Sequence, residues 1–212
     1  MKKAAFLLCL MMASFVLTAQ KKEGWSLSGT FMNRYVWRGN DYGNGPVVQP
    51  SFSYSFKNFS IGAWGNYSLN ISPNNAEVDL WSSYSFSKTF KMLLTDYYFP
   101  VEPGNQGNFM SCNAHTYELG AMKTFGRFQA SFYGLLNGPN TMYGEVKYTK
   151  NKISLFIGGG GTTNNNLCIH NTGISYQDAL EVSDRFQIPI QGSLIYNPSS
   201  EQIYLTFGFT IQ

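Results

Sequence analysis

The sequence predicts an all-β protein, a transmembrane antiparallel up-and-down β-barrel of about twelve strands. Three observations favour this fold class. Apolar and polar residues alternate through nearly all of the chain after residue 20, which is the pattern of half-buried strands. The alternating segments are close to the length of about 9–11 residues that a tilted membrane-spanning strand needs. Charged residues make up only 13% of the 212-residue chain.

The composition excludes several other classes of protein. Hydrophobic residues are 43% of the chain and aromatic residues 17%, whereas disordered chains are poor in aromatic residues. A soluble surface carries roughly 25–35% charged residues, well above the value found here. The net charge of +3 is small and not clustered, so we do not expect a nucleic-acid partner. The length allows one domain or at most two, and no linker or domain boundary is visible in the sequence.

The first residues have the layout of a secretory signal peptide. Met1-Lys2-Lys3 is a short basic start, and an almost wholly apolar run from Ala4 to Val16 follows it. Leu17-Thr18-Ala19 then provides a small residue for cleavage. We predict a signal peptide over 1–19 and a mature barrel domain over 20–212. The apolar run is too short to span a membrane as a helix, which needs about 20 residues.

Alternation and turn residues define the individual strands. Phe52-Ser53-Tyr54-Ser55-Phe56 places aromatic rings on one face and hydroxyl groups on the other. Lys57-Asn58 and Gly126-Arg127 are typical turns between such segments. The predicted strands are 25–38, 47–56, 59–69, 77–86, 90–99, 115–125, 128–136, 141–148, 153–161, 170–177, 186–196 and 202–211.

The composition of the two faces indicates which of them points outward. The polar faces contain mostly Ser, Thr, Asn, Gly and Tyr, with few charges, and the apolar faces are large and aromatic. A membrane barrel turns such apolar faces to lipid and surrounds a polar lumen. Closure of the barrel leaves no unpaired edge in the lipid. Outer-membrane lipid is therefore the expected partner of the outer surface.

Loop lengths and aromatic residues predict the orientation. With a periplasmic amino terminus, the outer loops are 39–46, 70–76, 100–114, 137–140, 162–169 and 197–201, and most inner turns are shorter, although 178–185 is long. Aromatic residues at strand ends suggest two interfacial girdles. The inner girdle would contain Phe56, Phe59, Phe86, Phe125, Phe128 and Tyr148, and the outer one Trp37, Tyr67, Tyr97, Phe99 and Tyr117.

The few charges are expected to line the lumen, because a lipid-facing Arg or Lys near the midplane costs about 2–4 kcal/mol. Two interpretations stay open. Opposing charges form a constriction that selects small polar solutes or ions, or they pair across the lumen and fill it. Acidic residues outnumber basic ones, which suggests a slight cation preference. The lumen-lining candidates are Arg34, Arg38, Glu77, Asp79, Asp96, Glu118, Glu145 and Lys147.

Enzymatic chemistry has little support in the sequence. His170-Asn171-Thr172 has a threonine where a lipid hydrolase of this architecture needs serine, and His115-Thr116-Tyr117 lacks a nucleophile. We interpret both histidines as polar residues near the membrane rim. The glycine run at Gly158–Gly161 lacks the Lys-Ser/Thr of a phosphate loop. No His/Cys spacing predicts a metal site, and no cofactor is expected.

Cys112 and Cys168 both fall in predicted outer loops. An oxidising compartment permits disulfides, so a bridge between these two loops is one alternative and free thiols the other.

Four segments carry a family resemblance. They are Tyr35-Val36-Trp37-Arg38-Gly39, Pro46-Val47-Val48-Gln49-Pro50, Ile61-Gly62-Ala63-Trp64 and Glu77-Val78-Asp79-Leu80. Residues 25–100 thereby resemble the TorF-type porin family of bacterial outer-membrane proteins. The Leu-Thr-Ala-Gln cleavage region is similar to those of Bacteroidota, which are Gram-negative. The chain ends in Thr210-Ile211-Gln212 rather than in the terminal Phe that is usual in such barrels. The resemblance implies a porin-like role and names no solute.

These observations predict a non-enzymatic barrel in the outer membrane of a Gram-negative cell, which passes small polar solutes or ions passively. The alternative is a structural or surface-recognition barrel whose loops 39–46, 70–76 and 162–169 do the work. The sequence does not predict the oligomeric state.

Overall fold

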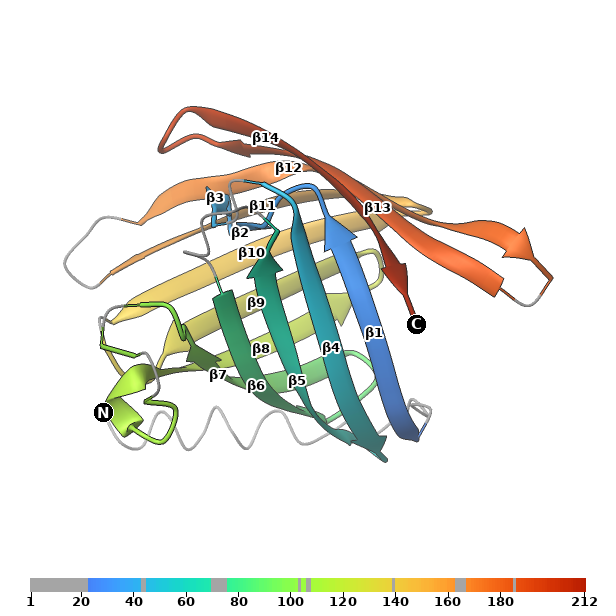
Figure 1. Ribbon diagram of the computed structural model, residues 1–212. Coiled ribbons are helices and arrows are strands. Elements are labelled where there is room, and N and C mark those ends of the chain that lie inside the picture. Colours follow the sequence, from blue (N-terminus) through green and yellow to red (C-terminus); the bar gives the residue numbers. More distant parts are fainter. Residues whose placement is uncertain are drawn as a thin grey trace.

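The computed structural model describes residues 23–42, 45–69, 76–102, 104–105, 108–138, 140–162, 167–184 and 186–212. The predicted signal peptide lies outside these residues. Twelve antiparallel strands close into one barrel in sequence order, and β14 pairs with β1 to complete it (Figure 1). The barrel strands are β1 (Gly24–Met32), β4 (Val47–Phe56), β5 (Phe59–Ser68), β6 (Ala76–Ser85), β7 (Phe90–Tyr98), β8 (His115–Phe125), β9 (Phe128–Leu135), β10 (Thr141–Lys150), β11 (Ile153–Thr162), β12 (Cys168–Ser183), β13 (Phe186–Asn197) and β14 (Gln202–Ile211).

The predicted fold class and strand count are confirmed, because a period of two residues dictates both the strands and their faces. Nine of the predicted strands differ from the structure by at most one residue at each end, namely those at β4, β5, β6, β7, β8, β9, β11, β13 and β14. The largest errors concern the first strand, which ends at Met32 instead of continuing to 38, and β12, which continues to Ser183. The residues after Met32 instead form a short hairpin of β2 (Val36–Trp37) and β3 (Asn40–Asp41).

The two faces of the wall have opposite polarity. Large apolar side chains are exposed on the outside of every barrel strand, among them Leu27, Phe52, Leu94 and Leu205. Buried polar residues such as Ser60, Glu77 and Thr206 face inward. Burial of polar groups inside an apolar outer surface is the arrangement of a membrane barrel. Phe56, Phe59, Phe86, Phe125 and Phe128 are all exposed on the outer face beside the short turns, at the place predicted for the inner girdle.

We call the two ends of the barrel the turn end and the loop end. The turn end carries the short connections, such as Lys57–Asn58 and Gly126–Arg127, and the loop end carries the hairpin β2–β3 and the short 3-10 helix η1 (Cys112–Ala114).

The seam between β1 and β14 is the shortest pairing of the barrel. It contains register pairs only from Gly29 opposite Ile211 to Met32 opposite Gly208. The side chain of Asn33 prolongs it, since its Nδ2 donates to the Leu205 carbonyl at 3.0 Å and its Oδ1 accepts from the Phe207 amide at 2.7 Å. An amide side chain thus makes the pair of hydrogen bonds that a further strand residue would make.

The hairpin of β12 and β13 projects beyond its neighbours at the turn end (Figure 1). The pairing of β12 with β11 stops at Tyr176, whereas its pairing with β13 continues to Ser183. The segment 178–185, predicted as a long inner turn, is therefore mostly strand. We call residues 178–183, with their partners on β13, the overhang.

No helix among the described residues is long and apolar enough to cross a membrane.

Candidate functional site

The hairpin β2–β3 lies inside the barrel and turns at Arg38 and Gly39. Trp37 pairs with Asn40, so the turn has two residues. Both have positive φ angles, 49° at Arg38 and 77° at Gly39, as a type I′ hairpin turn requires. An arginine in this conformation is strained by roughly 1–3 kcal/mol, so its surroundings must hold it there.

A carboxylate and three aromatic rings surround the guanidinium group of Arg38. Its Nη1 and Nη2 donate to the two carboxylate oxygens of Glu118, each at 2.7 Å. Its Cζ lies 4.2 Å from the ring centre of Trp37 and 4.5 Å from those of Tyr133 and Tyr143. The Tyr97 hydroxyl group donates to the same Glu118 carboxylate at 2.9 Å. The bidentate pair neutralises both charges and anchors the turn on β8.

The backbone of the turn is held from the opposite side of the barrel. His170 Nδ1 donates to the Arg38 carbonyl at 2.9 Å, and Asn197 Nδ2 donates to the Gly39 carbonyl at 2.9 Å. The hairpin is therefore bonded to β8 through a side chain and to β12 and β13 through its backbone. It crosses the lumen near the loop end.

A β-bulge turns two neighbouring residues of β12 toward the lumen. Gly158 pairs with Asn171 and Gly159 with Ile169, which leaves His170 as the extra residue. His170 holds the hairpin, and Asn171 donates to Glu145 Oε2 at 2.9 Å. Bulges redirect side chains in this way. Gly158 and Gly159 of the glycine run lie opposite this bulge.

The stem of the hairpin is fixed by charge and by aromatic contacts. Arg34 Nη1 lies 2.9 Å from Asp41 Oδ2. The ring centre of Tyr35 is 5.6 Å from that of Trp64 on β5, and the ring centre of Trp37 is 5.9 Å from that of Tyr97 on β7. Arg34 and Arg38 therefore belong to the inward hairpin. The sequence predicts both of them on the first strand, and that placement is wrong because the strand ends at Met32.

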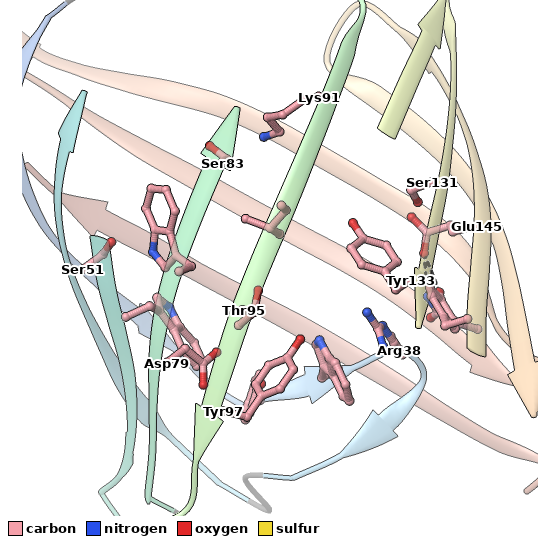
Figure 2. A pocket seen from close by; sticks show the side chains of 17 residues that line it. Arg38, Ser51, Asp79, Ser83, Lys91, Thr95, Tyr97, Ser131, Tyr133 and Glu145 are labelled. Atoms are coloured by element: carbon pink, nitrogen blue, oxygen red, sulfur yellow. Dashed lines mark hydrogen bonds between the residues drawn. The ribbon is translucent and has the colours of Figure 1, made fainter. Parts of the chain in front are cut away.

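A cavity of about 600 Å³ adjoins the hairpin inside the lumen. Figure 2 shows Asp79 and Tyr97 at one side of it and Arg38, Tyr133 and Glu145 at the other. Three tryptophans and four tyrosines are among its lining residues, which are Tyr35, Trp37, Arg38, Ser51, Trp64, Asp79, Trp81, Ser83, Lys91, Leu93, Thr95, Tyr97, Ser131, Tyr133, Tyr143, Glu145 and Asn171.

Most of the charges predicted for the lumen face it. Asp79 and Glu145 line the cavity, and Glu118 holds Arg38 beside it. Glu77 and Lys147 are two residues away from Asp79 and Glu145 on β6 and β10 and so share their faces. Glu118 therefore binds the hairpin directly, Asp79 and Glu145 line the cavity beside it, and Lys147 lies toward the turn end of β10.

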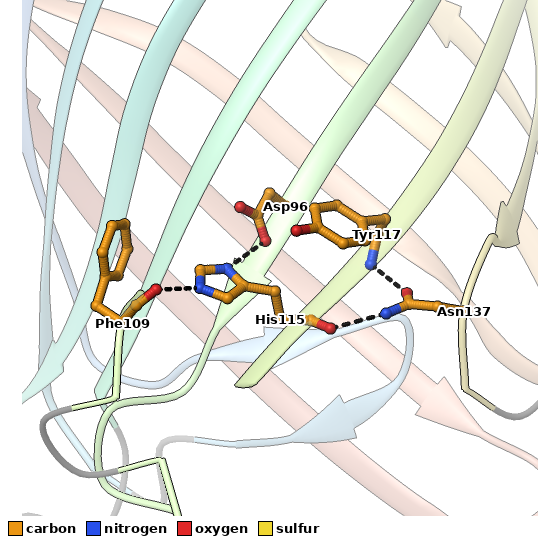
Figure 3. Close-up of polar contacts among 5 residues, drawn as sticks. All are labelled: Asp96, Phe109, His115, Tyr117 and Asn137. Atoms are coloured by element: carbon orange, nitrogen blue, oxygen red, sulfur yellow. Dashed lines mark hydrogen bonds and ion pairs between the residues drawn. The ribbon is translucent and has the colours of Figure 1, made fainter. Parts of the chain in front are cut away.

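Asp96 is different and corrects the sequence prediction. Its neighbours Thr95 and Tyr97 line the cavity, so Asp96 points to the outer face. There its Oδ1 lies 2.8 Å from His115 Nδ1, while His115 Nε2 lies 2.6 Å from the Phe109 carbonyl (Figure 3). His115 and Asp96 thus fasten the connection that follows β7 against the rim.

Cys112 and Cys168 are both free thiols in the structure. Cys112 is in η1, and Cys168 at the start of β12 directs its thiol to the Gly160 carbonyl at 3.7 Å. The disulfide considered from the sequence is therefore absent.

Sequence reasoning missed the residues that hold the hairpin. Trp37 and Tyr97, expected in an outer girdle, line the lumen cavity, and His170, expected only at the rim, binds the turn. One signal could have revealed the hairpin, namely an Arg-Gly pair between two short alternating segments. The local sequence around Asn171 and Asn197 does not indicate what either side chain binds, because their partners are distant in the sequence.

Comparisons with known proteins give little further information. No family model matches the chain, and no curated protein matches it. The TorF-type resemblance therefore stays a prediction. Among solved structures, the chain is similar to a substituted form of the Rh. blastica porin with a TM-score of 0.40 and 10% sequence identity, over 78% of this chain and 55% of that chain. The chain thus spans about half the length of that porin.

Proposed function

We propose that the protein is a porin-like barrel of the outer membrane that lets small polar solutes or ions pass passively through a restricted lumen. The observation that carries this proposal is the inverted polarity of the wall, with large apolar side chains outside and buried polar side chains inside. Lipid would surround the outer face, and water and solute would occupy the interior. The proposal includes removal of the predicted signal peptide over 1–19 and a non-enzymatic role.

The inward hairpin would make this pore narrow. It is bonded to strands on both sides of the lumen through Glu118, His170 and Asn197. A solute would have to pass beside it or displace it, so only small species are expected to pass. The charges available to a solute favour cations. Glu118 and Asp41 are neutralised by arginines, whereas Glu77, Asp79 and Glu145 remain on the inner face with Lys91 and Lys147.

Conductance and flux measurements test the proposal. Purified protein in a planar bilayer is expected to give small, cation-preferring currents, and liposomes are expected to admit small ions and amino acids before disaccharides. Glu118→Gln, which loosens Arg38, is expected to increase the current. Glu181→Gln on the overhang removes a carboxylate outside the lumen and serves as the control. A folded barrel that conducts nothing, both in the native form and with Glu118→Gln, would contradict the proposal.

The alternative of a surface-recognition barrel has one supporting observation, which is that the hairpin obstructs the lumen. The first of its three proposed loops is partly withdrawn from the surface, because Gly39 is bonded to Asn197 inside the barrel. Residues 70–75 and 163–166 of the other two loops lie outside the described residues. Absence of flux together with a folded barrel would favour this alternative.

A further inference from the structure

Asp79 is a buried carboxylate in the cavity wall that lacks a complete set of partners. The residue is 8% exposed, and its Oδ1 atom has no hydrogen-bond partner. Glu77, two residues earlier on the same inward face of β6, is 5% exposed. Its carboxyl group is hydrogen-bonded by the Tyr35 hydroxyl group of the hairpin and shares a hydrogen bond with the Asp79 carboxyl group. A buried carboxyl pair without a basic partner is costly, so a ligand that brings positive charge would be stabilised here.

Aromatic rings surround Asp79 on several sides. On β5 its cross-strand neighbour is Trp64, and on β7 it is Tyr97. Directly opposite residues have Cβ atoms about 4.5–5.5 Å apart, so both rings flank the carboxylate. The hairpin covers these rings from above, since Tyr35 contacts Trp64 and Trp37 contacts Tyr97. We call Asp79 with Tyr35, Trp37, Trp64 and Tyr97 the Asp79 cage.

No basic side chain among the described residues forms an ion pair with Asp79. Arg38 lies over the Trp37 ring, with its Cζ 4.2 Å from the ring centre, but both of its terminal nitrogens are committed to Glu118, and Arg34 is paired with Asp41. Lys91 lines the same cavity but lies opposite Ser85, whereas Asp79 lies opposite Tyr97. At about 3.3 Å per residue, this difference in register separates the two by about 20 Å along the wall. A lysine side chain is far too short to cover that distance.

The surroundings favour an organic cation over a metal ion. Hard metal cations take six or more oxygen ligands, and no group of three metal-binding side chains occurs among the described residues. The faces of aromatic rings attract ammonium groups instead, and rings arranged around a carboxylate suit quaternary or methylated ammonium ligands. The cavity of about 600 Å³ is within the range of roughly 300–1,000 Å³ that is typical of small-molecule sites.

We propose that the Asp79 cage binds a small organic ammonium ion, with its cationic head against Asp79 and between the rings of the cage. As a statement about what enters the lumen, this inference rests on the proposed function. Binding itself can be measured without flux. The site would make the lumen selective for alkylammonium solutes over neutral solutes of the same shape.

Tryptophan fluorescence of the full chain in an uncharged maltoside detergent provides the test. Three of the four tryptophans line the cavity, and Trp25→Phe removes the fourth, which faces outward. Choline and tetramethylammonium are expected to change the emission saturably. Dimethylbutanol, the uncharged carbon isostere of choline, is expected to cause no saturable change. An equal response to dimethylbutanol, or no response to choline, would overturn the proposal, since the cage would then be simple packing or a water site.

Variants locate the binding. Asp79→Asn keeps the shape of the side chain and is expected to weaken choline binding about tenfold or more, and Trp64→Leu about tenfold. Glu181→Gln removes a carboxylate from the overhang and is expected to leave binding unchanged. Heat-modifiable migration in gels verifies that each barrel is closed. Unchanged choline affinity in a folded Asp79→Asn or Trp64→Leu barrel would overturn the assignment of the cage.

The two proposals fail in different ways. A barrel that conducts ions but does not bind choline overturns the cage and leaves the pore. A barrel that binds choline through Asp79 but conducts nothing overturns the pore and leaves the cage.

Discussion

Gly39 is the residue on which the position of the hairpin depends most directly. Its φ angle is 77°, and a Cβ atom added to it would lie 1.8 Å from the His170 carbonyl oxygen, which is fixed backbone. Both facts forbid a side chain, the first because of local strain and the second because of close approach. The hairpin can rest on the bulge of β12 only through a glycine.

Gly39→Ala is therefore expected to displace the turn. The loss of hairpin stability should be about 2 kcal/mol or more, since the strain alone costs roughly 1–3 kcal/mol. Hydrogen exchange of residues 33–42 should become faster, and the bilayer current should rise. Gly138→Ala is the matched control, because Gly138 has a φ of 79° and open space around it. Equal protection of the hairpin in both variants would contradict this explanation.

The ion pair of Arg38 and Glu118 leads to a second prediction at this scale. The two side chains are 14% and 4% exposed, so removal of one charge leaves the other buried. Glu118→Gln is expected to cost about 3–5 kcal/mol, measured as a lower urea midpoint in detergent. The double variant Arg38→Met/Glu118→Gln should recover part of this loss, because no uncompensated charge remains. A double variant less stable than Glu118→Gln would show that the pair acts by another route.

Among the elements, the seam of β1 and β14 depends on one side chain. The side chain of Asn33 makes two hydrogen bonds to β14 there, in addition to the one from its backbone amide to the Phe207 carbonyl, beside only four register pairs. Asn137 makes an equivalent pair with the Tyr117 amide at 2.7 Å and the His115 carbonyl at 2.8 Å. Its strands β8 and β9 are paired from Glu118 opposite Leu135 to Phe125 opposite Phe128, so the two asparagines form a natural comparison.

Asn33→Ala is expected to lower the temperature at which the barrel loses its folded gel mobility more than Asn137→Ala does. Each hydrogen bond contributes about 1 kcal/mol, but only at the seam does the loss fall on a short pairing. The reverse order of the two variants would mean that the seam does not limit stability.

The overhang has an electrostatic contact outside the barrel wall. Lys152 Nζ lies 2.7 Å from Asp178 Oδ1. The hydrogen bond from Lys152, followed by that from the Tyr176 hydroxyl group, lowers the pKa of Asp178 to about 2. A lowered pKa of an acid means that the contact stabilises the folded form above the ordinary pKa of about 3.9. This stabilisation is lost as the pH falls toward 2.

Lys152→Met is expected to raise the pKa of Asp178 toward 3.9, as measured by carboxyl carbon chemical shifts with labelled aspartate in nanodiscs. Lys150→Met, which removes a nearby lysine that does not pair with Asp178, is the control. A pKa of Asp178 that stays near 2 without Lys152 would assign the shift to Tyr176 and the backbone.

For the whole molecule, the decisive property is the direction of each face. Leu93 lines the cavity, and Leu94 is 43% exposed on the outside. Arginine in place of Leu94 should cost about 2–4 kcal/mol in a bilayer, whereas arginine in place of Leu93 reaches a wet lumen and should cost less. Urea titration of folding into liposomes measures both. Equal costs would contradict the assignment of the faces.

The sequence is sufficient to predict the strands of the barrel wall but not the inward hairpin, and the reason is physical. Each wall residue obeys a local rule, since Phe52, Tyr54 and Phe56 need only alternate with serines to face lipid. Arg34 and Tyr35 continue that alternation, yet they leave the sheet because Arg38 finds Glu118 and Gly39 finds Asn197. These partners are separated by 80 and 158 residues. The prediction for Asp96 is wrong for a related reason, because on the outer face Asp96 is bonded to His115, which is itself bonded to the Phe109 carbonyl.

The short seam also has a consequence for how the molecule is assembled. Every other pair of neighbouring barrel strands is also consecutive in the order of barrel strands along the chain. Thr30 on β1, by contrast, must meet Thr210 on β14 across 180 residues. Bringing together segments that are distant in the sequence carries the largest loss of chain entropy. The few hydrogen bonds between β1 and β14 offset this loss least. We expect the pairing of β1 with β14 to form last during biogenesis and to separate first under force. An assembly factor that holds the open barrel would therefore act on β1 and β14.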